Sequence, residues 1–327
     1  MSDLIAFHGS SALKKQCIER IEKYRDAGSL NPFINVAWMP EHSMCTPLGA
    51  LLESADVDKF EPATGLPLQL AMLYQALLGV SVVSIPHEGS GDGAFSSAPP
   101  VFLLPDAIAG HWTAWLEGIK PGSRLPDLFA HVTAWILRDL ASADHPVAPL
   151  PPGVQARVSA VAQLFEAEAA GQVVPAQQWA AVRKTCVEMT DALAVDAGQP
   201  AFVKPITEFL ESVCWPWAGD YAEPLQSLRS LAGPITQALA TRLSSAKDLE
   251  VIAGQGRAMG EYVALAQKDP KFDAQAFFKQ SKELTAYWSF EFQQVLANQQ
   301  LQTTPLVGGR MLAGLVECIG NAQSNGA

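Results

Sequence analysis

The sequence predicts an all-α, multi-helix globular protein with room for one short strand or hairpin near residues 80–85. Apolar residues recur at helical spacing through most of the 327 residues, and only residues 80–85 carry a strand pattern. Hydrophobic residues make up 49% of the chain and charged residues 17%, which is typical of a folded protein with a lightly charged surface. A chain of this length buries a large core and usually divides into two domains.

The first predicted helix carries its own start and stop residues. Ser10 and Ser11 are good N-caps, and Gly28 is a typical C-terminal stop. The apolar residues between them lie three or four positions apart, at Leu13, Cys17, Ile21 and Tyr24. The spacing therefore predicts an amphipathic helix between Ser11 and Gly28.

The rest of the first half alternates between a loop and further helices. Residues 66–79 repeat apolar side chains at helical spacing after Pro67, and residues 87–98 are rich in Gly and Ser, which is typical of a loop. Residues 105–119 and 125–143 again have helical periodicity. Core positions are predicted for the tryptophans of these two helices, Trp112, Trp115 and Trp135.

A proline-rich segment predicts the domain boundary. Four prolines between His145 and Gly153 favour an extended spacer, so we expect domains at 1–145 and 154–327 with a linker at 146–153. The second domain is alanine-rich. Its predicted helices are 153–170, 175–195, 201–213, 222–231, 234–245, 248–267, 273–299 and 309–321.

Charge and cysteine usage exclude several classes of protein. The net charge is −11, and the Lys and Arg residues form no basic stripe, so the sequence predicts no nucleic-acid partner. No apolar run reaches the ~18 residues of a membrane span, and the N-terminus lacks a secretory signal. The five cysteines are odd in number and far apart, which argues against a disulfide framework. We expect a cytoplasmic protein with reduced thiols and no membrane partner.

The stretch "NVAWMPEHSMCTPLGALLES" contains the candidate catalytic residues Glu41, His42 and Cys45. A thiolate and an imidazole three positions apart on a helix could bind zinc or form a nucleophile. Pro40 and Pro47, however, argue against one helix through the segment, and Pro47 fits the first turn of a helix that begins after it. The sequence predicts no metal site and no cofactor.

Two further motifs invite a functional interpretation. Gly254, Gly256 and Gly260 follow an apolar run as in a dinucleotide-binding turn, but the required flanking strands are missing, so the glycines either allow close helix packing or break a helix. The segment "VCWPWAGDY" carries Trp215, Trp217 and Tyr221 at a corner between helices. These aromatic residues predict either a packing staple or an interaction edge.

The first ~140 residues resemble an uncharacterised bacterial all-α family with a Gly- and Cys-rich segment. The resemblance rests on "LIAFHGSSALKKQCIERIEKYRDAG", "TGLPLQLAMLYQALLG" and "FLLPDAIAGHWTAWLEGIKPGSRLPDLFAHVTAWILRDL". Cys45 and Thr46 match the family's Cys segment, but Glu41 stands where its first Cys would be, and Tyr74 and Gln75 replace an acidic pair. The resemblance implies a similar fold. The family has no established activity, so no functional residue is carried over from it.

The sequence therefore predicts a non-catalytic helical protein that acts through protein–protein contacts, with a protein partner or by self-association as a homo-oligomer. Its support is the lack of a catalytic motif together with many apolar helices. A metal- or thiol-dependent enzyme with a site near Glu41, His42 and Cys45 is the alternative. A helical binder of an apolar small molecule is the second alternative.

Overall fold

The structure is a computed structural model of the chain. It describes residues 4–32, 36–39, 41, 44–86, 101–126, 128–194, 200–215, 222–269 and 271–324. Helices dominate these residues, and the strands form two short two-stranded sheets, so the predicted all-α class is confirmed.

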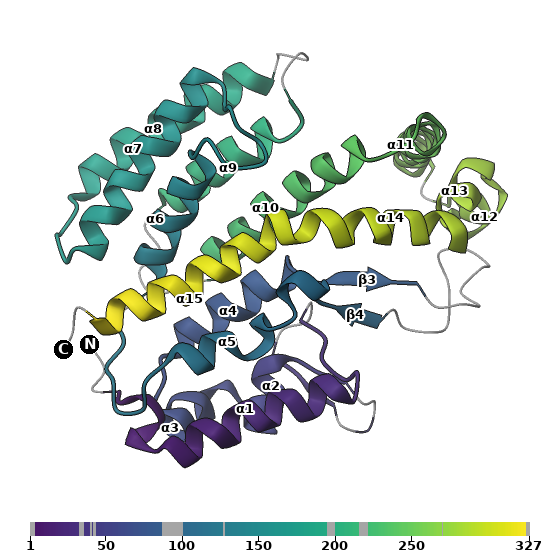
Figure 1. Cartoon of the computed structure of the whole chain (residues 1–327). Coiled ribbons are helices and arrows are strands. Elements are labelled where there is room, and N and C mark those ends of the chain that lie inside the picture. Colours follow the sequence, from purple (N-terminus) through teal and green to yellow (C-terminus); the bar gives the residue numbers. More distant parts are fainter. Residues whose placement is uncertain are drawn as a thin grey trace.

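The N-terminal elements form the lower part of the molecule in Figure 1. Its helices are α1 (Ser11–Asp26), α2 (Pro47–Leu52), α3 (Phe60–Thr64), α4 (Leu68–Gly79) and α5 (His111–Gly118), with short 3-10 turns at Ala6–Gly9, Val57–Lys59 and Asp106–Ile108. Its strands are β1 (Trp38–Met39), β2 (Met44–Cys45), β3 (Val83–Ile85) and β4 (Val101–Leu103).

The remaining helices build the upper part and a long diagonal across the middle (Figure 1). They are α6 (Phe129–Leu140), α7 (Pro152–Ala169), α8 (Ala176–Ala194), α9 (Val203–Val213), α10 (Ala222–Arg242), α11 (Ala246–Lys268), α12 (Ala274–Gln280), α13 (Lys282–Tyr287), α14 (Phe290–Thr303) and α15 (Gly308–Ser324), with a 3-10 turn at Thr304–Leu306. Helices α14 and α15 follow one another along the diagonal, and α11–α13 gather at its far end.

Local capping explains where α1 and α2 begin. The Ser10 side chain accepts a hydrogen bond from the Leu13 backbone N–H, and Gly28 takes a positive φ of 64° just beyond the helix, as predicted. Thr46 caps α2 by accepting from the Gly49 N–H, with Pro47 in the first turn. Both helix starts are confirmed.

The short strand predicted at residues 80–85 is confirmed as β3. It pairs antiparallel with β4, so that Val83 lies opposite Leu103 and Ile85 opposite Val101. The strand partner was not predicted. The glycine-rich segment 87–98, predicted to be a loop, lies outside the described residues.

Two predicted helix boundaries in the second half are wrong. The predicted break at Pro234 is absent, because α10 continues through this proline while Leu231, Ala232 and Ile235 around it are buried. The single helix predicted at 273–299 is instead three helices. Ser281 and Ser289 divide it, because each side chain caps the helix that follows.

One hydrophobic core extends from the N-terminal elements to α15. Its members come from both predicted domains, and Val147 and Leu150 of the proline-rich segment are buried in it. Trp112 and Trp115 are buried as predicted, whereas Trp135 is half-buried and donates its Nε1–H to Glu317 at 3.1 Å. The proline-rich segment 146–153 is thus a packed connection between α6 and α7.

Helix α15 ties the two halves together, since it contacts α4, α5 and α6. Arg310 of α15 donates two hydrogen bonds to the carboxylate of Asp139 at the end of α6, one of them at 2.9 Å. Gln323 accepts from the Lys120 N–H at 2.6 Å and donates to the Gly118 carbonyl at 2.9 Å. These polar contacts set the position of α15 against segments roughly 200 residues earlier in the chain.

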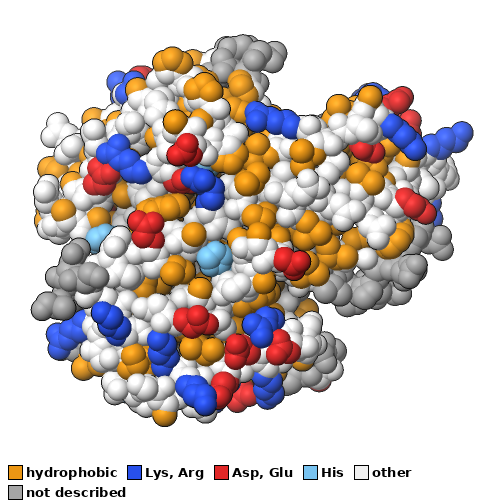
Figure 2. Space-filling model, in the orientation of Figure 1, with side chains coloured by type: hydrophobic (Ala, Val, Ile, Leu, Met, Phe, Trp, Pro, Cys, Tyr) orange, Lys and Arg blue, Asp and Glu red, His pale blue; other side chains and the backbone are white. Residues whose placement is uncertain are grey.

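Among the described residues, none of the helices combines the length and the apolar character that crossing a bilayer requires. On the face that Figure 2 shows, Lys and Arg side chains are interspersed with Asp and Glu, and hydrophobic side chains gather along the middle.

Candidate functional site

The structure separates Cys45 from Glu41. Cys45 of β2 is buried, and its thiol donates toward the Ser29 carbonyl at 3.7 Å. Burial raises the pKa of this thiol to about 11. Glu41 is exposed, and His42 lies outside the described residues. A nucleophile or a metal ligand must be a thiolate, so the burial of Cys45 disfavours both roles.

The predicted interaction edge has one described member, Trp215. Trp217 and Tyr221 lie outside the described residues. Trp215 follows α9 and is 51% exposed, which is unusual for so large an apolar side chain. The guanidinium carbon of Arg183 from α8 lies 3.9 Å from the centre of its ring. This cation–π contact fixes the indole at the surface.

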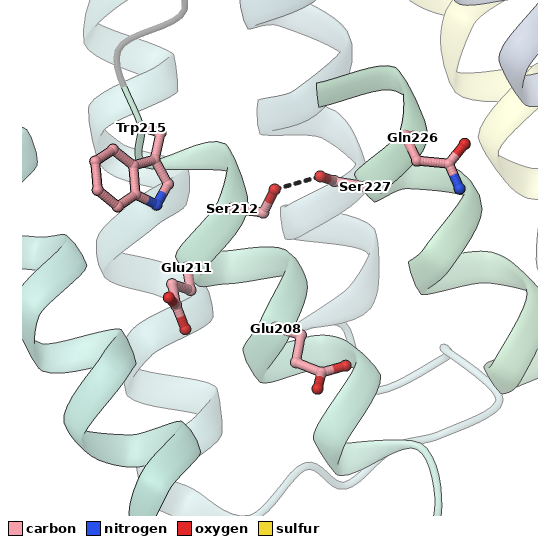
Figure 3. Close-up of a pocket in the computed structure, with 6 residues that line it drawn as sticks. All are labelled: Glu208, Glu211, Ser212, Trp215, Gln226 and Ser227. Carbon is pink, nitrogen blue, oxygen red and sulfur yellow. Dashed lines mark hydrogen bonds between the residues drawn. The ribbon is translucent and has the colours of Figure 1, made fainter. Parts of the chain in front are cut away.

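A surface pocket of about 450 Å³ adjoins this tryptophan. Figure 3 shows Glu208, Glu211 and Ser212 on α9 with Trp215 beyond the end of that helix, while Gln226 and Ser227 come from α10. The α9 residues lie at intervals of three, four and seven positions, so they share one helix face. The opposite face of α9 is buried in the core through residues that include Ile206, Phe209 and Leu210.

The polar groups of the pocket differ in their pairing. Ser212 and Ser227 hydrogen-bond to each other across α9 and α10 (Figure 3). Glu208 lies 3.6 Å from the Lys204 ammonium, in an exposed pair between residues four apart. Within the described residues, Glu211 takes part in no ion pair of this kind, so it is the carboxylate that is open to a ligand.

Two cysteines meet directly behind Trp215. Cys186 of α8 and Cys214 at the end of α9 are both buried, and their thiols share a hydrogen bond. This bond, with help from Arg157, lowers the pKa of Cys186 despite burial. The same bond, together with burial, raises the pKa of Cys214. The thiol pair therefore joins α8 to the end of α9.

Sequence reasoning missed both the thiol pair and the carboxylates of the pocket. Cys186 and Cys214 are too far apart in the chain for any spacing rule to pair them. The spacing of Glu208, Glu211 and Ser212 did contain a signal, because these polar residues recur on one face of the helix predicted at 201–213. Only the position of α10 shows that this face borders a pocket.

A second polar cluster lies where α6 meets α15. The imidazole Nδ1 of buried His145 accepts a hydrogen bond from the Val147 N–H at 3.3 Å. Its Nε2 lies 3.9 Å from the carboxylate of Asp139, which Arg310 already holds. Burial lowers the pKa of His145 to about 4, and Arg310 contributes to the same effect against the opposing charge of Asp139. The cluster is enclosed and connects elements, so it serves the fold.

Metal ligation has no candidate cluster in the part of the chain that the structure describes, since no three His, Cys, Asp or Glu side chains converge there. The chain matches no protein-family model, no curated protein sequence and no solved structure. The resemblance of the N-terminal half to an uncharacterised bacterial family therefore stays an expectation.

Proposed function

We propose that this protein is a non-catalytic, cytoplasmic adaptor or regulatory protein that binds a partner protein at the pocket between α9 and α10. The observation that carries the proposal is the half-exposed indole of Trp215, held at the rim of a pocket with a free carboxylate. Tryptophan is enriched among the few residues that supply most of the binding energy of protein interfaces.

The chemistry of the pocket favours a basic side chain of the partner. Glu211 offers a carboxylate, and the indole of Trp215, which is 51% exposed, offers aromatic surface to a second cation. An arginine of the partner can bind both the carboxylate and the indole, because its planar guanidinium pairs with a carboxylate and stacks on an aromatic ring. The partner is therefore a protein segment that presents an arginine or a lysine.

Binding is better supported than catalysis at this pocket. The two serine hydroxyls bond to each other, and the thiols of Cys186 and Cys214 are buried. A catalytic serine needs a base within hydrogen-bond reach, and the Ser212 hydroxyl is instead engaged with the Ser227 hydroxyl. The five cysteines are free, buried thiols, which supports a reducing compartment such as the cytoplasm.

A peptide array tests the proposal. Purified full-length protein is applied to peptides in which one central residue is Arg, Lys, Gln or Glu. We expect binding to follow Arg, then Lys, and to weaken with added salt, because the contact is partly ionic. Trp215→Ala and Glu211→Gln should each weaken the binding of Arg peptides about tenfold.

Matched variants control for damage to the fold. Trp215→Phe keeps an aromatic ring and should retain part of the binding, and Glu188→Gln removes an exposed carboxylate of α8 that does not line the pocket. The proposal fails if basic peptides bind no better than neutral ones. It also fails if binding is unchanged in the Trp215→Ala variant.

A further inference from the structure

Helix α11 is covered on one side only. Its inner side packs on α13, where Gly254 is buried against the Glu283 side chain. Near its end, Tyr262 joins an aromatic cluster with Phe272 and Phe277 at ring distances of 5.8 and 6.0 Å. In Figure 1, α11 lies at the edge of the molecule beside α12 and α13. The opposite side of the helix is left to solvent.

The outer face of α11 carries no charge along its whole length. At 100° per residue, one side of the helix collects Leu249, Ile252, Ala253, Gly256, Gly260, Val263, Ala264 and Gln267. Ile252 is half-buried and the other seven are exposed, with Leu249 at 41% and Val263 at 46%. A Cβ built on Gly256 or Gly260 meets nothing within 4 Å, so the centre of this face is flat and open.

Four charged residues run along one flank of this outer face. Glu250, Arg257, Glu261 and Lys268 fall within 40° of each other around the helix, and all four are exposed. Their signs alternate along the helix as negative, positive, negative, positive. Within the described part of the chain, no ion pair holds any of the four.

Read from the other end of the helix, the four charges have the opposite signs, so the charges of two antiparallel copies are complementary. Residue 259 is the midpoint of both Glu250–Lys268 and Arg257–Glu261. In an antiparallel helix pair with a two-fold axis through residue 259, Glu250 lies opposite Lys268 of the second copy, and Arg257 lies opposite Glu261 of the second copy. The same flank of both copies lies on one side of the contact, as a two-fold axis requires.

We propose that α11 binds the α11 of a second copy of this chain, antiparallel and through its outer face. Gly256 and Gly260 let the two backbones approach closely, and Leu249 and Val263 bury apolar surface on either side of them. The flanking charges favour the antiparallel direction, because a parallel two-fold pair would place the charged flanks of the two copies on opposite sides of the contact, where they cannot pair. An unrelated partner would not require charges that are antisymmetric about the centre of the helix.

Sedimentation equilibrium of the full-length protein tests the dimer over a range of concentrations. A single helix pair lies at the lower end of specific interface sizes, below about 1,200 Å², so we expect a reversible monomer–dimer equilibrium in the micromolar range. A wild-type chain that stays monomeric at hundreds of micromolar overturns the proposal.

Charge variants test the direction and the register of the pair. Arg257→Glu places two carboxylates opposite each other twice in the dimer, so we expect about a tenfold or larger rise in the dissociation constant. The double variant Arg257→Glu/Glu261→Arg restores opposite charges in every pair and should dimerise like the wild type. A single variant that dimerises normally, or a double variant that does not recover, overturns the register.

Glycine variants test the face itself. Gly260→Glu inserts a carboxylate at the centre of the outer face and should give a monomer at all concentrations. Gly153→Glu makes the same change at an exposed helical glycine of α7 whose Cβ also meets nothing within 4 Å, and it should leave the dimer intact. A dimer that persists in Gly260→Glu shows that another surface makes the contact and overturns the proposal. Circular dichroism confirms that each variant is folded.

Discussion

Helices α4 and α11 are both poor in charged residues on a broad face, yet the fold covers them very differently. Nine of the twelve residues of α4 are buried, against two of the 23 residues of α11. Neighbours on several sides enclose α4, namely α2, α6, α10 and α15, whereas α11 rests on α12 and α13. An apolar face therefore indicates that something covers a helix, but the covering element need not belong to the same chain.

The same substitution in each helix gives the largest expected difference. Leu77→Ala in α4 removes a fully buried side chain, so we expect it to lower the free energy of unfolding by about 3 kcal/mol. Leu249→Ala in α11 removes a side chain that is 41% exposed and should cost about 0.5 kcal/mol or less in the monomer. Urea denaturation at low protein concentration measures both. Equal losses would show that the two helices are equally covered.

The pH dependence of stability tests how α15 is held against α6, on the covered side of the molecule. The pKa of His145 is about 4 in the folded protein, below its ordinary value of 6.5, so between these values the unfolded chain binds more protons. The free energy of unfolding should therefore fall as the pH falls from 6.5 to 4, by up to about 3 kcal/mol.

The control for this effect is His145→Asn, whose side-chain oxygen can still accept from the Val147 N–H. The variant lacks the titrating imidazole, so its stability should change less between pH 6.5 and 4 than that of the wild type. Urea midpoints of the two proteins across this pH range give the comparison. Parallel pH profiles would contradict the assignment to His145.

Capping separates α14, in which five residues are buried, from the more exposed helices α12 and α13 before it. The Ser289 hydroxyl accepts from the Phe292 N–H at the start of α14. Ser289→Ala should lower the free energy of unfolding by about 1 kcal/mol, and Ser289→Asp, which can also cap, should lose much less. Thermal or urea denaturation of the three proteins measures the difference. Equal losses in both variants would mean that the cap does not stabilise the helix.

The smallest expected effect distinguishes the two sides of α11. Gly256→Ala places a methyl group in open space and should raise the free energy of unfolding by about 0.5–1 kcal/mol through helix propensity. Gly254→Ala brings a Cβ to 3.3 Å from the Glu283 Cγ, so packing against α13 should cancel most of that gain. A gain of equal size at both positions would show that α13 does not press on Gly254.

Two helix boundaries predicted from the sequence are wrong because they depend on contacts with other helices as well as on the local sequence. Pro234 predicted a break, but α10 is embedded deeply enough for packing to outweigh the lost backbone hydrogen bond. Ser281 and Ser289 each cap a new helix, although the residues around them favour one continuous helix. A proline inside a helical segment, or a serine between apolar residues, is compatible with either a continuous or a broken helix. Packing against the neighbouring helices determines which of the two forms.

The candidate site was only partly predictable for the same reason. Trp215 stood out in the sequence as an aromatic residue at a helix corner, and it lies at the rim of the pocket. The partners that give the pocket its chemistry come from α8 and α10, since Arg183 stacks on the indole and Ser227 closes the hydrogen bond to Ser212. No spacing rule connects residues on separate helices.

The sequence by itself determined the all-α class, the starts of α1 and α2 and the short strand β3. Caps, turn glycines and apolar periodicity act within a few residues of each other, so they can be read from the chain directly. Only the tertiary structure decided that one core spans both halves, that Arg310 meets Asp139 and that the outer face of α11 stays uncovered. These contacts depend on the packing of whole helices against one another, and the local pattern of each helix is compatible with several such arrangements.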